Sequence, residues 1–165
     1  MHIELRPAAE SDKPVLRQLM ELYRHDFSEW DDSDVDEQGF FGSPYLDRYW
    51  TEPDRYPFLI RADGRLAGFV LLSRRSHLVP QGSAMVVAEF FVMRKYRHQG
   101  VGRHAAIAAF DRFPGAWEVG QMAANTGAQA FWREVIGAYT GGQYVETVPD
   151  DERWRGPIQS FDNSR

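Results

Sequence analysis

Apolar residues recur along this chain in two patterns, the alternation typical of strands and the spacing typical of helices. Residues 2–6 alternate and predict a first strand. Ser11 or Asp12, followed by Pro14, predicts the start of a helix. The apolar face of that helix comprises Val15, Leu16, Leu19, Met20, Leu22 and Tyr23.

The clearest local signal is a β-hairpin. Two β-rich runs, residues 56–61 and 65–73, flank the dipeptide Asp63-Gly64. Asp-Gly supplies the positive φ angles that a tight hairpin turn requires, so the two runs are expected to pair antiparallel.

The other segments follow from the same patterns and from Gly and Pro breakers. They are a polar stretch of unclear structure at 26–42, a short helix at 45–50, a loop containing Pro80 and Gly82, a strand at 84–93, a helix at 101–113, a strand at 117–124, a helix at 125–136, and strands at 143–148 and 157–161. A hairpin followed by a β-α-β unit predicts an α/β fold with a mixed sheet and helices on its faces.

Length and composition indicate one globular domain over residues 1–165, with 43% hydrophobic and 26% charged residues. No apolar run approaches about 18 residues, so no membrane span is expected. No secretory signal is visible, and a cytoplasmic location is expected. The net charge of -5 argues against a nucleic-acid partner. The oligomeric state is open, and the sequence is compatible with a homodimer.

Charge is unevenly distributed along the chain. Residues 1–60 carry 14 acidic and 6 basic side chains, and seven of these acids lie within residues 26–37 among aromatic residues. Acids and aromatic faces together attract cations, which suggests a site for a cationic amine. The candidate ligands are Tyr23, Phe27, Trp30 and Asp31. The alternative is a solvated acidic loop whose aromatic residues pack on the core.

A glycine-rich turn, RHQGVGR at residues 97–103, joins the most apolar strand to a helix. Glycine allows a tight turn and the close approach of a ligand. The first N–H groups of a helix have no partner within it and favour an anion, helped by the helix dipole. Arg94, Lys95, Arg97 and Arg103 add positive charge. The turn therefore predicts a site for a diphosphate.

Three interpretations of this turn are open. The segment GVGRHA at residues 100–105 matches the GxGxxA dinucleotide fingerprint, which would imply an NAD(P)-dependent oxidoreductase. Against this, about six residues separate the strand from Gly100, and the nearby acid, Glu118, begins its strand rather than ending it. The second interpretation is a plain strand-to-helix turn with solvated arginines. The third is a family resemblance.

The turn resembles motif A of the GNAT superfamily of acyl-CoA N-acyltransferases, R/Q-x-x-G-x-G/A, which Arg97, Gly100 and Gly102 supply. EFFVMRKYR resembles the family's fourth strand, and VGQMAANTGAQAFW its fifth strand and next helix. IELRPAAESD and the Asp-Gly hairpin also resemble the family, so the resemblance covers nearly the whole chain. It implies a mixed, mostly antiparallel sheet, with parallel strands four and five splayed apart and helices on both faces.

The resemblance also implies that acetyl-CoA binds between these two strands and donates its acetyl group to an amine on a small molecule or peptide. Main-chain groups near Phe91 and Val92 are expected to pair with the pantetheine arm. The residues expected to bind acetyl-CoA are Phe91, Val92, Arg97, His98, Gln99, Gly100, Val101, Gly102, Arg103, Asn125 and Trp132.

The chemistry requires a base and a route for the leaving thiolate. An attacking amine must be neutral, whereas an alkyl ammonium has a pKa of about 10.4. Glu89 lies in an apolar strand, where burial would raise its pKa, and it is the candidate base; the alternative is a solvated or ion-paired carboxylate.

Many members of the family protonate the thiolate with a tyrosine directly after the position of Phe131, where this chain has Trp132. An indole N–H donates hydrogen bonds but is not a useful acid. Tyr139 and Tyr144 are candidate substitutes, and unassisted departure of the thiolate is the other option. The same difference leaves open a non-catalytic acyl-CoA-binding sensor.

The chain has no cysteine, which excludes disulfides and an acyl-cysteine intermediate, so direct transfer is expected. Its histidines show no metal-ligand spacing with nearby carboxylates, and no metal is expected.

Overall fold

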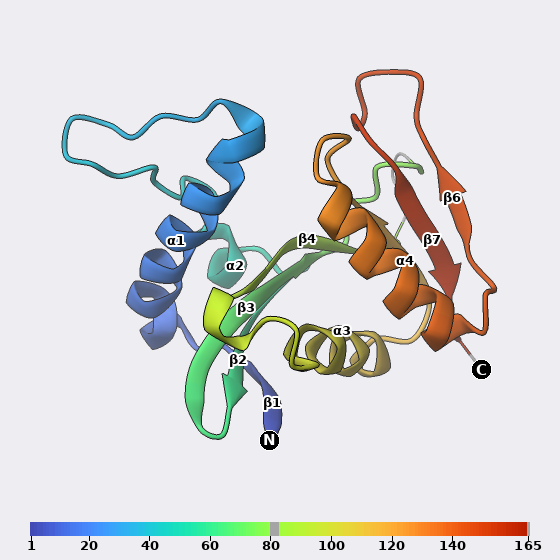
Figure 1. The fold of residues 1–165 in the computed structure, drawn as a ribbon, viewed down its shortest axis with the longest axis horizontal. Coiled ribbons are helices and arrows are strands. Elements are labelled where there is room, and N and C mark those ends of the chain that lie inside the picture. Colours follow the sequence, from blue (N-terminus) through green and yellow to red (C-terminus); the bar gives the residue numbers. More distant parts are fainter. Residues whose placement is uncertain (80–82, 165) are drawn as a thin grey trace.

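The computed structural model describes residues 1–79 and 83–164, so the predicted loop at Pro80 and Gly82 lies outside the described residues. Within this part of the chain, a seven-stranded sheet has the order β1-β2-β3-β4-β5-β7-β6 (Figure 1). The strands are β1 (Ile3–Pro7), β2 (Arg55–Ala62), β3 (Arg65–Ser73), β4 (Met85–Val92), β5 (Ala116–Gly120), β6 (Val145–Thr147) and β7 (Ile158–Asp162). All neighbouring strands are antiparallel except β4 and β5, which confirms the predicted mixed sheet.

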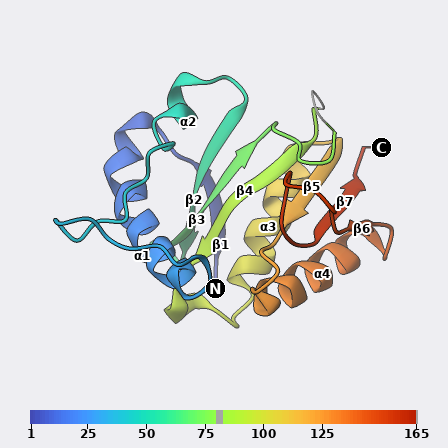
Figure 2. The same ribbon diagram turned by 90° about the horizontal axis from the view of Figure 1, so that it is seen from above.

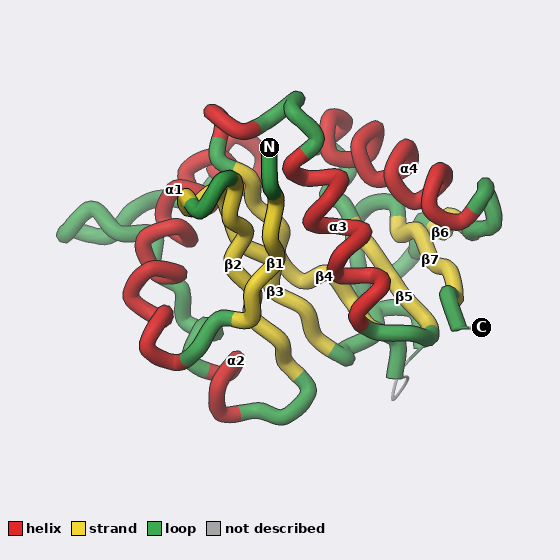
Figure 3. The backbone as a smooth tube through the Cα atoms, turned by 90° about the horizontal axis from the view of Figure 1, so that it is seen from below, coloured by secondary structure: helices red, strands yellow, loops and turns green. Residues whose placement is uncertain are grey.

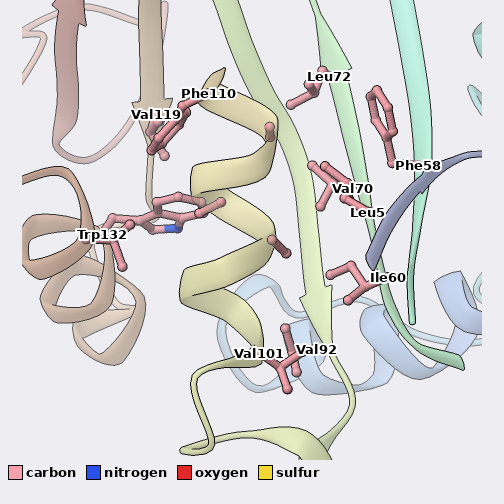
Figure 4. Packing of buried hydrophobic residues seen from close by; sticks show 14 of the residues in the cluster. Leu5, Phe58, Ile60, Val70, Leu72, Val92, Val101, Phe110, Val119 and Trp132 are labelled. Atoms are coloured by element: carbon pink, nitrogen blue, oxygen red, sulfur yellow. The ribbon is translucent and has the colours of Figure 1, made fainter. Parts of the chain in front are cut away.

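Helices cover both faces of this sheet, as predicted (Figure 2 and Figure 3). The helices are α1 (Lys13–Asp31), α2 (Arg48–Thr51), α3 (Val101–Arg112) and α4 (Thr126–Thr140), with 3-10 turns η1 (Glu10–Asp12) and η2 (Arg94–Tyr96). Leu16 and Leu19 of α1 pack with Phe69 on one face. On the other face, Phe110 of α3 packs against Trp132 of α4 and Val119 of β5 (Figure 4).

The largest differences from the prediction lie at three element boundaries. The polar stretch after Tyr23 begins as helix, because α1 continues to Asp31 and ends where Asp32 adopts a left-handed conformation with φ 56°. The strand β5 ends at Gly120 rather than at residue 124. The indole of Trp154 lies so close to Gly120 that a Cβ there would be 2.9 Å from it. The helix α4 runs through Gly137 and ends before Gly141, whose φ is 62°.

Strands β4 and β5 separate shortly after they meet. Their parallel pairing is confined to Met85 with Trp117 and Val86 with Glu118, whereas β4 remains paired with β3 as far as Val92. The splayed pair implied by the family resemblance is therefore present. Beyond Val86, the edge of β4 that faces β5 has no strand partner within the described residues.

A β-bulge lies in β4 where the two strands separate. Leu71 of β3 pairs with Glu89 and its neighbour Leu72 pairs with Val87, so Ala88 is an extra residue in β4. A bulge changes the face to which the following side chains point. As a result, Glu89 and Phe91 point towards α1, while Val87 and Phe90 pack with the cluster under α3 and α4.

Gly68 is required where β3 passes β4. A Cβ at Gly68 would lie 1.9 Å from the carbonyl oxygen of Phe91, which is main chain and cannot give way cheaply. Gly68→Ala is therefore expected to lower the free energy of unfolding by about 3 kcal/mol. Denaturant unfolding measures this, with Gly127→Ala in α4 as the matched control, because a Cβ at Gly127 meets nothing closer than 4.0 Å. Equal stability of the two variants would contradict the close approach.

No helix within residues 1–79 and 83–164 is long and apolar enough to cross a membrane.

Candidate active site

Two adjoining cavities open where β4 and β5 separate. The first cavity measures about 850 Å³ and the second about 630 Å³. The first extends towards α2 and Trp154, and the second towards the start of α3. Six residues line both: Tyr23, Phe27, Phe90, Asn125, Ala128 and Trp132. A ligand in one cavity can therefore meet a ligand in the other beside Phe90.

Glu89 is the acid at this junction. Glu89 lines the first cavity, and its carboxylate accepts a hydrogen bond from the Tyr23 hydroxyl. Burial raises the pKa of Glu89 to about 7, although the hydrogen bond from Tyr23 and the positive charge of Arg24 both act to lower it. A carboxyl group with a pKa near neutrality can accept and release a proton under physiological conditions.

Tyr23 holds this carboxylate from the opposite side of the site. It lies on α1, is buried, and packs against Phe27, Phe69 and Phe91 with ring centroids 4.5 to 5.8 Å away. Burial and the charge of Glu89 raise the pKa of Tyr23 well above its ordinary value, so the hydroxyl stays protonated and donates.

The start of α3 provides backbone donors next to the second cavity. His104 is the first residue of this helix whose N–H has a main-chain partner, the carbonyl of Gly100 at 3.0 Å. His98 and Gly100 both have positive φ, 60° and 82°. The amides of residues 98–103 form no hydrogen bond with another described residue, and Gly102 lines the second cavity. Unpaired amides at a helix N-terminus bind anions.

Arg97 fixes this turn against β4 and α1. Its Nε donates to the carbonyl oxygen of Val92 at 2.7 Å, and its Nη2 donates to Asp26 at 2.5 Å. Arg94 donates to the other oxygen of Asp26 at 2.7 Å. Burial acts to raise the pKa of Asp26, but these two guanidinium groups hold it below its usual range. The turn and α1 are thus tied together by charge.

Most residues predicted to bind acetyl-CoA lie together at the second cavity. Its lining includes Phe91, Val92, Arg97, His98, Gly102, Asn125 and Trp132. Gln99, Gly100 and Arg103 are exposed on the adjacent turn, and Val101 is buried beneath it. The main-chain carbonyl of Phe91 faces Gly68 of β3, and the carbonyl of Val92 accepts a hydrogen bond from Arg97.

The structure does not bring the two candidate tyrosines to this site. Neither Tyr139 nor Tyr144 lines either cavity. The Tyr139 hydroxyl donates to Asp111 at 2.8 Å, and its ring packs against Phe110 at the far end of α4. Trp132, in contrast, lines both cavities, and its indole N–H donates to no other residue in the described part of the chain.

The acidic segment mostly does not face the first cavity. Of its seven acids only Asp31 lines this cavity, while Asp26 and Glu29 line the second. Asp36 accepts hydrogen bonds from the amides of Gln38 and Phe40. Among the predicted acceptor ligands, Tyr23 and Phe27 line both cavities and Trp30 lines the second.

Three basic residues of the first cavity, Arg24, Arg48 and Arg55, were not predicted from the sequence. Arg24 has a recognisable signal, because it shares a helical stripe with Met20, Phe27 and Asp31, which are spaced three or four residues apart along α1. Arg48 and Arg55 lie around α2, and only the folding of that segment brings them to the site.

Glu118, the nearby acid considered for the dinucleotide fingerprint, forms hydrogen bonds elsewhere. It is buried, with 3% exposure, and accepts hydrogen bonds from the Ser76 hydroxyl and the His77 amide. Across the described residues, no group of three or more His, Cys, Asp or Glu side chains is arranged to hold a metal ion.

Comparisons with known proteins place the chain among its relatives. Residues 16–138 match the model of the acetyltransferase (GNAT) family. No curated protein matches the sequence. An acetyltransferase structure from Thermus thermophilus superposes with a TM-score of 0.69 at 14% identity, covering 98% of this chain and 97% of that chain.

Two further structures carry ligands. The PaiA N-acetyltransferase of Thermoplasma acidophilum, in complex with coenzyme A, has a TM-score of 0.64 at 14% identity, covering 98% and 99% of the two chains. An aminoglycoside acetyltransferase from an uncultured soil metagenomic sample, in complex with sisomicin, has a TM-score of 0.59 at 16% identity, covering 81% and 86%. At these identities the likeness shows a shared fold.

Proposed function

The chain belongs to the GNAT family of acetyltransferases, whose model matches residues 16–138, and from this premise we propose that it transfers the acetyl group of acetyl-CoA directly to a primary amine with Glu89 as general base. The observation that carries the proposal is the position of Glu89. Glu89 lines the first cavity, and the next residue, Phe90, lines both cavities. A base is thus available where an amine in the first cavity would meet a thioester in the second.

The second cavity has the features that acetyl-CoA requires. The unpaired amides of residues 98–103 suit a pyrophosphate. Glycine is needed at position 102 of this turn, because a Cβ there would lie 3.1 Å from the Phe131 ring. Phe91, Val92 and Asn125 line the path from that turn to Phe90. These residues would hold the donor, which supplies a thioester whose C–S bond breaks as the new C–N bond forms.

The role of Glu89 follows from the protonation state of the amine. An ammonium ion has no lone pair for attack, so one proton must leave it before or during transfer. The carboxylate of Glu89 takes this proton, and the sulfur departs with the electron pair of the C–S bond as a thiolate. Since the chain has no cysteine, the acetyl group cannot rest on a cysteine thiol, and the proposed transfer is direct, with both substrates bound together.

Trp132 occupies the position where many members of the family have a tyrosine that protonates the leaving sulfur. Trp132 lines both cavities, and its indole N–H has no acceptor among the described residues. We propose that this N–H donates a hydrogen bond to the thiolate; an indole does not protonate it. The thiolate then takes its proton from solvent, because a thiolate is a fair leaving group without an acid.

Thermal unfolding with separate additions of acetyl-CoA, CoA and NADPH tests the donor. A ligand at about 100 times its dissociation constant stabilises the fold by about 2.7 kcal/mol. Acetyl-CoA and CoA are expected to raise the midpoint, and NADPH is not. Stabilisation by NADPH alone would overturn the proposal, and binding of acetyl-CoA without transfer to any amine would instead indicate a sensor.

Tyr23→Phe is expected to shift the pH dependence of the reaction. The hydroxyl stabilises the Glu89 carboxylate, so its removal raises the pKa of Glu89 above about 7. Activity requires the deprotonated carboxylate and is lost as pH falls through this pKa, so the acidic limb moves to higher pH. The profile of kcat against pH measures the shift, while kcat on the alkaline plateau stays within a few-fold. An unmoved limb would mean that Tyr23 does not act on Glu89.

A further inference from the structure

The first cavity is more basic than the acidic first third of the sequence suggests. Its lining contains three guanidinium groups, from Arg24, Arg48 and Arg55, and two carboxylates, from Asp31 and Glu89. Glu89 has a pKa of about 7, so near neutrality it contributes only part of a negative charge. Among the described residues, the lining of the first cavity therefore carries a net positive charge.

Beside this cavity, several arginines share the carboxylate of Glu52 as their ion-pair partner. Arg55 and Arg75 both contact its Oε2, at 2.6 and 2.7 Å, whereas Arg48 approaches only to 3.8 Å of Oε1. The Arg55 side chain is 10% exposed and bound in this pair. The Arg48 side chain is 47% exposed, and its guanidinium lies over the Tyr45 ring at 4.7 Å. Arg48 is thus only weakly neutralised.

Arg24 is the guanidinium best placed to bind a ligand. Its Nη1 donates to the carbonyl of Gly42 at 3.1 Å, and its guanidinium carbon lies 5.8 Å from the centre of the Phe41 ring. It forms no ion pair with any described residue. It is close enough to Glu89 for its charge to lower the pKa of that carboxyl group. A half-buried guanidinium with unpaired N–H groups favours a carboxylate, which it can bind through two parallel hydrogen bonds.

Resting on the proposed function, we propose that the acceptor is an amine that also carries a carboxylate, an amino-acid-type compound whose carboxylate binds Arg24. The same cavity then serves both ends of the acceptor, with the amine towards Glu89 and the carboxylate towards Arg24, and Arg48 adds positive charge at the open side. Phe27, Tyr45 and Trp132 provide apolar and aromatic walls for the body of the acceptor. A polycation would place positive charge against these arginines, so polyamines are disfavoured.

Paired acceptors that differ only in the carboxylate test this inference. With acetyl-CoA saturating, thiol release is measured for L-phenylalanine against 2-phenylethylamine, L-leucine against 3-methylbutylamine, and glycyl-L-phenylalanine against its C-terminal amide. At least one carboxylate-bearing member is expected to have a kcat/KM at least 10-fold above that of its partner. Equal or better use of the carboxylate-free partners, or a lower KM for spermidine than for every amino acid tested, would overturn it.

Variants of Arg24 locate the carboxylate. Arg24→Gln, which retains a donor for Gly42, is expected to raise the KM for the preferred carboxylate acceptor at least 10-fold and to leave the KM for the carboxylate-free partner within two-fold. Arg24→Lys is expected to raise this KM less than Arg24→Gln does, because lysine keeps the positive charge. Arg65→Gln, at the exposed start of β3, is the matched control and changes neither value. An equal rise for both acceptors would mean that Arg24 acts through the fold rather than on the carboxylate.

A binding measurement separates this inference from the proposed function, because it needs no turnover. Calorimetric titration of the CoA-loaded protein compares N-acetyl-L-phenylalanine with N-acetyl-2-phenylethylamine. Tighter binding of the first, lost in the Arg24→Gln variant, supports the carboxylate site even if no amine is acetylated. Binding of the second with equal affinity overturns the site even if acetylation occurs. In a separate titration of the CoA-free protein, displacement of bound N-acetyl-L-phenylalanine by added CoA would assign the arginines to the donor and also overturn the carboxylate site.

Discussion

Glu89→Gln is expected to lower kcat for an amine acceptor by about 10²- to 10⁴-fold at pH 8, the range associated with loss of a general base. Glu89 and Phe90 both line the first cavity, and glutamine cannot take the proton that the ammonium group must lose. Because the amide still accepts a hydrogen bond from Tyr23, the fold is expected to persist. Steady-state thiol release measures kcat.

Two controls accompany this variant. Its affinity for acetyl-CoA should stay within a few-fold of wild type, since Glu89 does not line the second cavity. Glu134→Gln, on the exposed side of α4, should leave kcat unchanged. If Glu89→Gln retained more than about one-tenth of wild-type kcat, the base would have to be another group or bulk solvent.

Gly100→Glu is expected to abolish the stabilisation of the fold by acetyl-CoA. Gly100 precedes the unpaired amides of α3, and a glutamate there would place a side chain and a negative charge in the path of the pyrophosphate. The loss corresponds to the whole ligand effect, about 2.7 kcal/mol at 100 times the dissociation constant. Thermal unfolding with and without acetyl-CoA measures it.

Gly64→Glu provides the matched control for this variant. Gly64 in the β2–β3 turn has a φ of 76°, close to the 82° of Gly100, and a Cβ at either position has no neighbour closer than 3.7 Å. Both substitutions therefore carry a similar backbone strain, and only Gly100→Glu is expected to lose the acetyl-CoA effect. If acetyl-CoA raised the unfolding midpoint of the Gly100→Glu variant as much as that of wild type, the pyrophosphate would not bind at this turn.

The elements could be predicted because their signals are local. Asp63-Gly64 fixed the hairpin, and the alternation of apolar residues identified β4 and its neighbours. The glycine turn at Gly100 and Gly102 lies at the start of α3, as its spacing indicated. The predicted ends of elements were wrong where the neighbouring side chain comes from a distant part of the sequence. At Gly120, where β5 ends, the close neighbour is Trp154, far along the sequence.

The candidate base was predicted, but its environment was not. Glu89 was identified from its apolar strand, whereas the bulge at Ala88 and the donor Tyr23 depend on pairing with β3 and on packing of α1. On the acceptor side, the charge count along the chain did not show which acids are already paired. Counting acids along the segment after Tyr23 suggested a cationic ligand, but Asp26 is neutralised by Arg94 and Arg97.

The pH profile of kcat for wild type and for the Glu89→Gln variant tests the central claim most directly. Wild-type kcat is expected to rise with pH through an apparent pKa near 7, where the Glu89 carboxylate becomes available. The variant should lack this limb and retain only the rise that follows the pKa of the amine itself. A limb near 7 that is present and unshifted in both proteins would contradict the assignment of Glu89 as the base.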